Sequence, residues 1–196
     1  MKNVLILLAQ GFEAYEGAAF TDVLGWADAF GNERIRTVAA GLHREVTCAF
    51  GLKVRTDALL GELDLDPFDA LAIPGGFGRA GFYRDAFSEE FLGAITRFHE
   101  RRKPVASVCV ASLSLGKSGI LKGRPATTYL LEERKKEQLA RMGALLQERE
   151  IVVDGHLITS SAPGNAVDVA FLLLGMLTSE ENAARVRSLM GMAGPA

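Results

Sequence analysis

Residues Lys103 to Gly116 read Lys-Pro-Val-Ala-Ser-Val-Cys-Val-Ala-Ser-Leu-Ser-Leu-Gly and give the clearest indication of the fold. The first half of this stretch is an apolar run typical of a buried strand, and its second half is typical of a helix. We therefore expect the chain to bend sharply at Cys109 and to raise that side chain above a sheet. Ser107 and Ala111, two residues before and two after, are the small neighbours that such a nucleophile elbow requires.

The sequence around this corner allows two interpretations of Cys109. A thiol at the start of a helix lies near unpaired N–H groups, whose partial positive charge favours the thiolate and makes the residue a nucleophile. A free cysteine is also among the most buried residue types and often serves as a small apolar side chain. The apolar neighbours Val108, Val110 and Leu113 favour the second interpretation, so spacing alone leaves both open.

Elsewhere the chain alternates short apolar runs with longer amphipathic segments. We expect strands at 3–9, 35–40, 70–73 and 105–108, hairpins at 46–55 and 151–159, a loop or single helical turn at 58–68, and helices at 13–30, 87–100, 111–118, 132–142, 163–177 and 180–190. This alternation is typical of an α/β fold with a mainly parallel sheet flanked by helices on both faces. In the second hairpin, Asp154 and Gly155 are expected to supply the positive φ angles of a type I′ turn.

Length and composition favour a soluble globular protein. The 196 residues show no internal repeat or linker, so we expect a single domain over 1–196 with a loose tail at 193–196. With 22 basic against 24 acidic residues the net charge is −2, which gives nucleic acid or an anionic membrane no electrostatic attraction. No apolar run reaches the roughly 18 residues of a membrane span. The charged run of 132–142 is interpreted as a solvated helix face.

Two further features bear on the cellular location. The N-terminal apolar run at 4–9 is too short for a secretory signal and suits a buried strand. Cys48 and Cys109 show neither a CxxC spacing nor nearby paired histidines, which indicates neither a disulfide framework nor a metal site. The cytoplasm is the expected location.

Polar and small residues follow three of the predicted strands. Glu13 and Glu16 follow the first strand, Gly75 and Gly76 follow the third, and Cys109 follows the fourth. Ligands bind at the carboxyl ends of strands in open α/β sheets, so one topology would bring these residues together. Glu16 is either a simple charge at a helix start or a carboxyl partner for the thiol. The glycine pair is either a tight turn or a source of N–H groups that face the pocket.

Together these segments resemble the ThiJ/PfpI superfamily, which includes the Parkinson-disease-associated deglycase. The matching pieces, in the family's order over about residues 3–178, are 4–16 (VLILLAQGFEAYE), 21–23 (TDV), 68–76 (FDALAIPGG), the Cys109 corner and 153–164 (VDGHLITSSAPG). The resemblance implies a flavodoxin-like, class I glutamine-amidotransferase-like fold with Cys109 at the elbow and Glu16 as its carboxyl partner. It also implies a homodimer with the active site near the subunit interface. Cys48 aligns with a cysteine that some relatives carry there, although a cysteine without a task is the alternative.

The chain departs from the family pattern in its polar groups. Val110 stands where protease- and amidase-like members carry a histidine, and Tyr129 stands where many deglycase-like members place one after a Thr-Thr pair. Ser161 and Ala162 replace an arginine that some relatives carry before Pro-Gly, which leaves an anionic substrate with fewer contacts. The histidines of the chain, all expected at the surface, are His43, His99 and His156. Peptidase chemistry, which needs a Cys-His-acid triad, is therefore the least expected activity.

The leading hypothesis is a cysteine-dependent enzyme of glyoxalase or deglycase type acting on a small-molecule carbonyl substrate or its adducts. Cys109 would attack the aldehyde carbon, and Glu16 would move protons. The amides of Gly75, Gly76 and Val110 would hold the oxyanion. No metal or organic cofactor is called for.

Two alternatives remain open at this point. The first is a redox-sensing or protective binding protein in which Cys109 is oxidised as far as sulfinic acid and no further. The second is a small-molecule hydratase or amidase, which needs another polar group near the sulfur. Thr128, Tyr129 and Asn165 are the candidates for that group.

Overall fold

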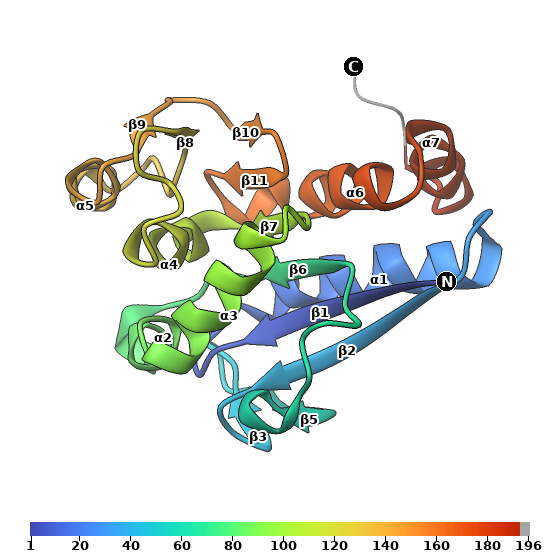
Figure 1. Cartoon of the computed structure of the whole chain (residues 1–196), viewed down its shortest axis with the longest axis horizontal. Coiled ribbons are helices and arrows are strands. Elements are labelled where there is room, and N and C mark those ends of the chain that lie inside the picture. Colours follow the sequence, from blue (N-terminus) through green and yellow to red (C-terminus); the bar gives the residue numbers. More distant parts are fainter. Residues whose placement is uncertain (193–196) are drawn as a thin grey trace.

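A seven-stranded sheet forms the centre of the computed structural model, which describes residues 1–192 (Figure 1). The strands lie in the order β10-β11-β7-β6-β1-β2-β5. Their bounds are Lys2–Leu8 (β1), Ile35–Gly41 (β2), Ala58–Leu59 (β5), Ala70–Ile73 (β6), Val105–Ser107 (β7), Ile151–Asp154 (β10) and Leu157–Ser160 (β11). Every neighbouring pair is parallel except β10 with β11, which confirms the mainly parallel sheet. The tail at 193–196, expected to be loose, lies outside the described residues.

Helices cover both faces of this sheet. On one face, α1 (Ala14–Phe30), α6 (Ala166–Leu177) and α7 (Glu180–Leu189) pack against one another. On the other, α3 (Glu89–Glu100) packs on β6 and β7, with α2 (Phe82–Ala86) and α4 (Ser112–Lys117) beside it and α5 (Glu133–Arg141) against α4. Figure 1 shows α1 behind the central strands and α3 in front of them. The predicted helical layers are confirmed.

Burial on both faces explains the unbroken apolar run of β1. Each residue from Val4 to Ala9 is at most 4% exposed. A strand covered on both sides needs apolar side chains in both directions, so its sequence shows no alternation. Phe20 of α1 and Phe91 of α3, both fully buried, belong to the core around it.

The register of the sheet positions the loops that carry the candidate site. Ile6 pairs with Ala72, which in turn pairs with Ala106. Because β1, β6 and β7 are parallel and in register, the loops that follow them leave the sheet at one edge. An isolated bridge between Phe12 and Gly76 ties two of these loops together.

Several short elements differ from the sequence-based expectations. The hairpin of β3 (Glu45–Thr47) and β4 (Lys53–Arg55) is confirmed, whereas the segment 58–68 contributes the edge strand β5 and a 3₁₀ turn at Leu60–Glu62. The pair β8 (Pro125–Ala126) and β9 (Leu145–Leu146) was not expected, because two-residue strands leave no periodicity in the sequence.

Helix starts also differ by a few residues. The helix expected at 87–100 begins at Glu89, because the Ser88 hydroxyl caps it by accepting the Phe91 N–H. The five-residue α2 before it was not expected. A 3₁₀ turn precedes both α4 and α6 and accounts for their later starts.

The turn between β10 and β11 corrects one expectation. The loop residues are Gly155 and His156, and Asp154 still pairs with Leu157. Gly155 has a φ of 61°, whereas Asp154 has no positive φ. The type I′ turn centred on Asp154 and Gly155 is therefore wrong, because the glycine occupies the first loop position and supplies the positive φ there.

We expect opposite effects on stability from two Gly→Ala substitutions. A Cβ at Gly76 would lie 2.3 Å from the Gly11 carbonyl oxygen and 2.6 Å from the Phe82 ring, so Gly76→Ala should lower the free energy of unfolding by about 1–3 kcal/mol. A Cβ at Gly93, within α3, meets nothing within 4 Å, so Gly93→Ala should raise it by about 0.5–1 kcal/mol. Urea unfolding of both variants against the wild type measures the two differences. Equal effects would contradict the packing described at Gly76.

Candidate active site

The chain turns at Cys109 between β7 and α4. Val108 is extended, Cys109 has a φ of 54°, and a 3₁₀ turn follows before α4 begins. A positive φ is strained for a residue with a side chain and persists where the surroundings hold it. Here the Val108 N–H donates to the Ile73 carbonyl at 3.1 Å, and the Ser112 hydroxyl donates to the Cys109 carbonyl at 3.0 Å. The chain thus turns sharply at Cys109 between a strand and a helix, and the role of this turn as a nucleophile elbow stays a prediction.

Glu16 lies at the same corner and has no exposed surface. Its Oε2 accepts the Gly75 N–H at 2.5 Å, while its Oε1 has no hydrogen-bond partner within residues 1–192. A Cβ at Gly75 would lie 2.7 Å from the Val108 carbonyl oxygen, 3.0 Å from Glu16 Oε2 and 3.2 Å from the Val110 nitrogen. These contacts bring the carboxyl group, the glycine and the elbow to one point.

The three amides predicted to hold an oxyanion differ in what they already bind. The Gly75 N–H donates to Glu16 and is occupied while that bond lasts. Within residues 1–192 the Gly76 N–H donates no hydrogen bond. Burial raises the pKa of the Cys109 thiol, and the Val110 N–H acts on the thiol in the opposite direction. The role of these amides in holding an oxyanion stays a prediction.

Burial dominates the protonation of both reactive groups. Loss of hydration raises the pKa of Glu16 to about 8, although the Gly75 N–H acts in the opposite direction. Burial also raises the pKa of the Cys109 thiol above its ordinary value, and a negative charge on Glu16 raises that pKa further. The expectation that the helix start favours the thiolate is wrong beside an ionised Glu16, because burial and repulsion together outweigh the Val110 N–H.

The other predicted polar residues have structural contacts. Thr128 is buried, and its hydroxyl donates to the Cys109 carbonyl at 3.5 Å, so it lies at the corner. Tyr129 is half-buried and packs against the core. The Asn165 side-chain oxygen accepts the Ser161 hydroxyl at 3.2 Å. Of the three candidates, Thr128 is the one with a contact to the elbow, and that contact is to its backbone.

The histidines differ from the expectation that all three lie at the surface. His43 is exposed, with its Nε2 3.2 Å from the buried Asp85 carboxylate. His99 and His156 are half-buried, and His99 Nδ1 lies 3.0 Å from His156 Nε2. Burial lowers the pKa of both rings. The surface expectation is wrong for this pair, because the β10–β11 turn brings His156 against α3.

Two side chains near the sulfur were not expected from the sequence. Burial raises the pKa of Tyr83, and the charge of Cys109 raises it further, which places the phenol within Coulombic reach of the sulfur. Lys135 is buried, and its Nζ lies 4.7 Å from the centre of the Tyr83 ring. One signal in the sequence indicates this burial, since Lys135 stands four residues before the buried Leu139 and shares its helix face.

Comparison with known proteins identifies the family. Residues 2–176 match the DJ-1/PfpI family. The chain belongs to this family. Protein dj-1beta of Drosophila melanogaster is 31% identical over 94% of each chain, and deglycase TK1284 of Thermococcus kodakarensis is 32% identical over 83% of this chain and 92% of the relative. The crystal structure of Drosophila dj-1beta matches with a TM-score of 0.85 at 28% identity, covering 98% of this chain and 99% of that one.

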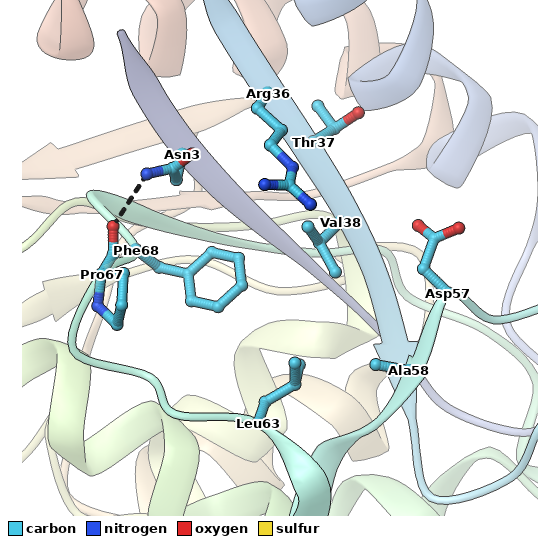
Figure 2. Close-up of a pocket in the computed structure, with 9 residues that line it drawn as sticks. All are labelled: Asn3, Arg36, Thr37, Val38, Asp57, Ala58, Leu63, Pro67 and Phe68. Atoms are coloured by element: carbon cyan, nitrogen blue, oxygen red, sulfur yellow. Dashed lines mark hydrogen bonds between the residues drawn. The ribbon is translucent and has the colours of Figure 1, made fainter.

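This DJ-1/PfpI chain also has a hollow away from the Cys109 corner. Figure 2 shows a pocket of about 520 Å³ between β2 and the segment 63–68, where the Asn3 amide donates to the Pro67 carbonyl at 3.1 Å. Arg36 and Asp57 supply charges to its wall, and no residue of the elbow lines it.

Within residues 1–192, no group of three or more His, Cys, Asp or Glu side chains is arranged to hold a metal ion. No helix in the described part of the chain is long and apolar enough to cross a bilayer.

We expect Glu16→Gln to stabilise the protein increasingly as the pH rises from about 5 to 8. Unfolded Glu16 loses its proton near pH 4.5 and folded Glu16 near pH 8, so the folded chain holds an extra proton between these values and loses stability as the pH rises. The glutamine keeps an oxygen for the Gly75 N–H and has no such proton. Urea unfolding at several pH values measures the difference, which should widen by up to about 1.4 kcal/mol per pH unit. A constant difference, equal to that of the exposed control Glu181→Gln, would contradict the raised pKa.

Proposed function

We propose that this chain is a cysteine-dependent enzyme of the glyoxalase or deglycase kind that acts on small reactive carbonyl compounds or their adducts. The observation that carries the proposal is the pair at the sheet edge, where Cys109 is held at a φ of 54° beside the fully buried Glu16. Membership of the DJ-1/PfpI family, and the similarity to a relative named a deglycase, support chemistry on this class of substrate.

Glu16 controls the charge of the sulfur in this proposal. Burial raises the pKa of Glu16 to about 8, so the carboxyl group is mostly protonated at neutral pH and does not repel a thiolate. As Cys109 adds to the substrate, Glu16 gives its proton to the substrate oxygen and takes the thiol proton in its place. Oε2 is held by the Gly75 N–H, which leaves Oε1 to carry the proton. The Val110 N–H then favours the thiolate that remains. Glu13 is half-buried three residues before Glu16, and its charge adds to burial in raising the pKa of Glu16, so Glu13 would connect the carboxyl group with the protein surface.

The thiolate then adds to the aldehyde carbon. A C–S bond forms as the C=O π bond breaks, and the oxyanion takes the proton from Glu16 to give a hemithioacetal. The N–H groups of Gly76 and Val110 stabilise the oxyanion before it is protonated. With methylglyoxal, Glu16 moves the C1 proton to C2 and so produces a thioester, which water hydrolyses to lactate. The sum is the addition of one water molecule, without an oxidant or a cofactor.

The test is methylglyoxal consumption by three variants. Cys109→Ala should abolish turnover, because no other group supplies the C–S bond, and Glu16→Gln should lower it by about 10²–10⁴-fold, because the amide cannot transfer protons. Cys48→Ala is the matched control and should retain wild-type turnover, because Cys48 lies at the end of β3. Lactate formation, measured enzymatically, gives the rate. No turnover by the wild type, or equal turnover by Cys109→Ala, would overturn the proposal.

A specific observation favours a second role as a redox sensor. The unpartnered Glu16 Oε1 can carry a proton beside the sulfur, and a protonated carboxyl group can donate a hydrogen bond to a sulfinate oxygen. Two molecules of peroxide would each transfer one oxygen to Cys109 and leave as water. The acid would stabilise the sulfinate and slow the third oxidation.

We expect mild peroxide to add two oxygen atoms at Cys109 and none at Cys48. Glu16→Leu has a similar volume but cannot donate a hydrogen bond, so in that variant oxidation should proceed to the sulfonic acid. Mass spectrometry of peptides after peroxide treatment distinguishes these products. Equal oxidation of both cysteines, or the same product in wild type and Glu16→Leu, would count against a sensor built on Glu16.

A further inference from the structure

Tyr83 and Lys135 come from two helices that pack around the segments of the Cys109 elbow. Phe82, next to Tyr83, packs at Gly76 in the loop beside the elbow, and the helix of Lys135 packs on α4, which leaves the elbow. Tyr83 comes from α2 and Lys135 from α5, and both helices gather with α4 at the same end of the molecule (Figure 1). The Lys135 Nζ lies 4.7 Å from the centre of the Tyr83 ring, within the range of a cation–π contact. Burial raises the pKa of Tyr83 and lowers the pKa of Lys135, and a negative charge on Cys109 acts on both groups as a smaller influence. The thiol, the phenol and the ammonium therefore lie within Coulombic reach of one another.

Among the described residues, the Tyr83 hydroxyl lacks an acceptor, and the Lys135 ammonium has a distant counter-ion. The Tyr83 hydroxyl is buried and has no hydrogen-bond partner within residues 1–192. The Lys135 side chain is 9% exposed, and its Nζ approaches the Glu132 carboxylate to 4.0 Å, which is too long for a hydrogen bond. Glu132 itself is 46% exposed and well solvated. A buried hydroxyl without an acceptor and a largely buried ammonium with a distant counter-ion are both costly, and an anion between them would lower that cost.

We infer that the Lys135 ammonium and the Tyr83 hydroxyl bind the anionic group of an aldehyde whose carbonyl carbon is attacked by Cys109. This inference rests on the proposed addition of the thiol to an aldehyde and adds the substrate class, which is small carbonyl compounds that carry a carboxylate or a similar anionic group. The sequence left an anionic substrate with fewer contacts, because Ser161 and Ala162 replace the arginine of some relatives. Lys135 supplies a cation from a different helix.

The addition of the Cys109 thiol to the aldehyde needs no further reactant. The thiol proton of Cys109 passes through Glu16 to the aldehyde oxygen as the C–S bond forms, so the product is a neutral hemithioacetal group. The carboxylate of the substrate keeps its charge throughout and stays paired with Lys135. The anionic group of the substrate therefore contributes to binding and orientation, and Glu16 moves the proton.

The experiment compares two small aldehydes that differ in charge. Glyoxylate carries a carboxylate where glycolaldehyde carries a neutral hydroxymethyl group, and each is tested for protecting Cys109 against iodoacetamide by mass spectrometry. The ratio of their half-protecting concentrations in the wild type gives the preference for glyoxylate. We expect Lys135→Met to reduce this preference by about tenfold or more, because a hydrogen bond to a charged group is lost. Lys136→Met, the neighbouring lysine that pairs with Glu133 and Glu148, is the matched control and should leave it unchanged.

Two further variants keep the test decisive. Lys135→Arg retains the charge and should retain most of the preference. Tyr83→Phe keeps the ring on which Lys135 packs and removes the hydroxyl, so it should weaken glyoxylate protection even if Lys135→Met fails to fold. Wild-type preference in both Lys135→Met and Tyr83→Phe would overturn the inference.

Protection measures binding at Cys109 and is independent of turnover. Methylglyoxal turnover together with an unchanged preference in Lys135→Met would overturn the anionic substrate class and leave the proposed reaction intact. Glyoxylate protection that depends on Lys135, without any methylglyoxal turnover, would support the anion site and overturn the proposed reaction.

Discussion

The hydrogen bond from the Gly75 N–H to the buried carboxyl group of Glu16 is the constraint on which the site depends. It joins the first turn of α1 to the loop after β6, two segments 59 residues apart in the sequence. A carboxyl group without exposed surface is costly to ionise, so burial keeps it protonated at neutral pH. A neutral acid can lie beside a thiol without repelling the thiolate. Burying Glu16 thus lowers the stability of the fold near neutral pH, and it places a proton donor at the sheet edge.

Close packing around this bond links the glycine to the strained elbow. The Val108 carbonyl oxygen and the Val110 nitrogen both approach the space that a Cβ at position 75 would occupy. Any side chain there would push the Cys109 corner away from Glu16. The positive φ of Cys109 and the absence of a side chain at Gly75 are therefore two parts of one arrangement, in which the backbone of one loop makes room for the turn of another.

The sheet edge could be predicted from the sequence, because an unbroken apolar run such as 4–9 indicates a strand buried on both faces, and parallel strands bring their carboxyl ends together. The sharp corner followed from the small residues at 107 and 111. The raised pKa of Cys109 could not be predicted, because it depends on groups that α1 brings close in space. Lys135 was missed for the same reason: its charged neighbours are typical of a solvated helix, and its burial depends on packing against Tyr83.

The charges around Cys109 explain why the proposed reaction would use an acid, Glu16, together with a cation, Lys135. Neutral Glu16 and a neutral thiol contribute no charge, and hemithioacetal formation moves a proton without changing that sum. The Lys135 ammonium is then left with a tyrosine ring and a distant carboxylate. A neutral substrate leaves this cation poorly compensated in a largely buried site, whereas an anionic one neutralises it. In the proposed reaction, the burial that keeps Glu16 protonated also favours Lys135 as the group that orients the substrate, so proton transfer and orientation would fall to separate side chains.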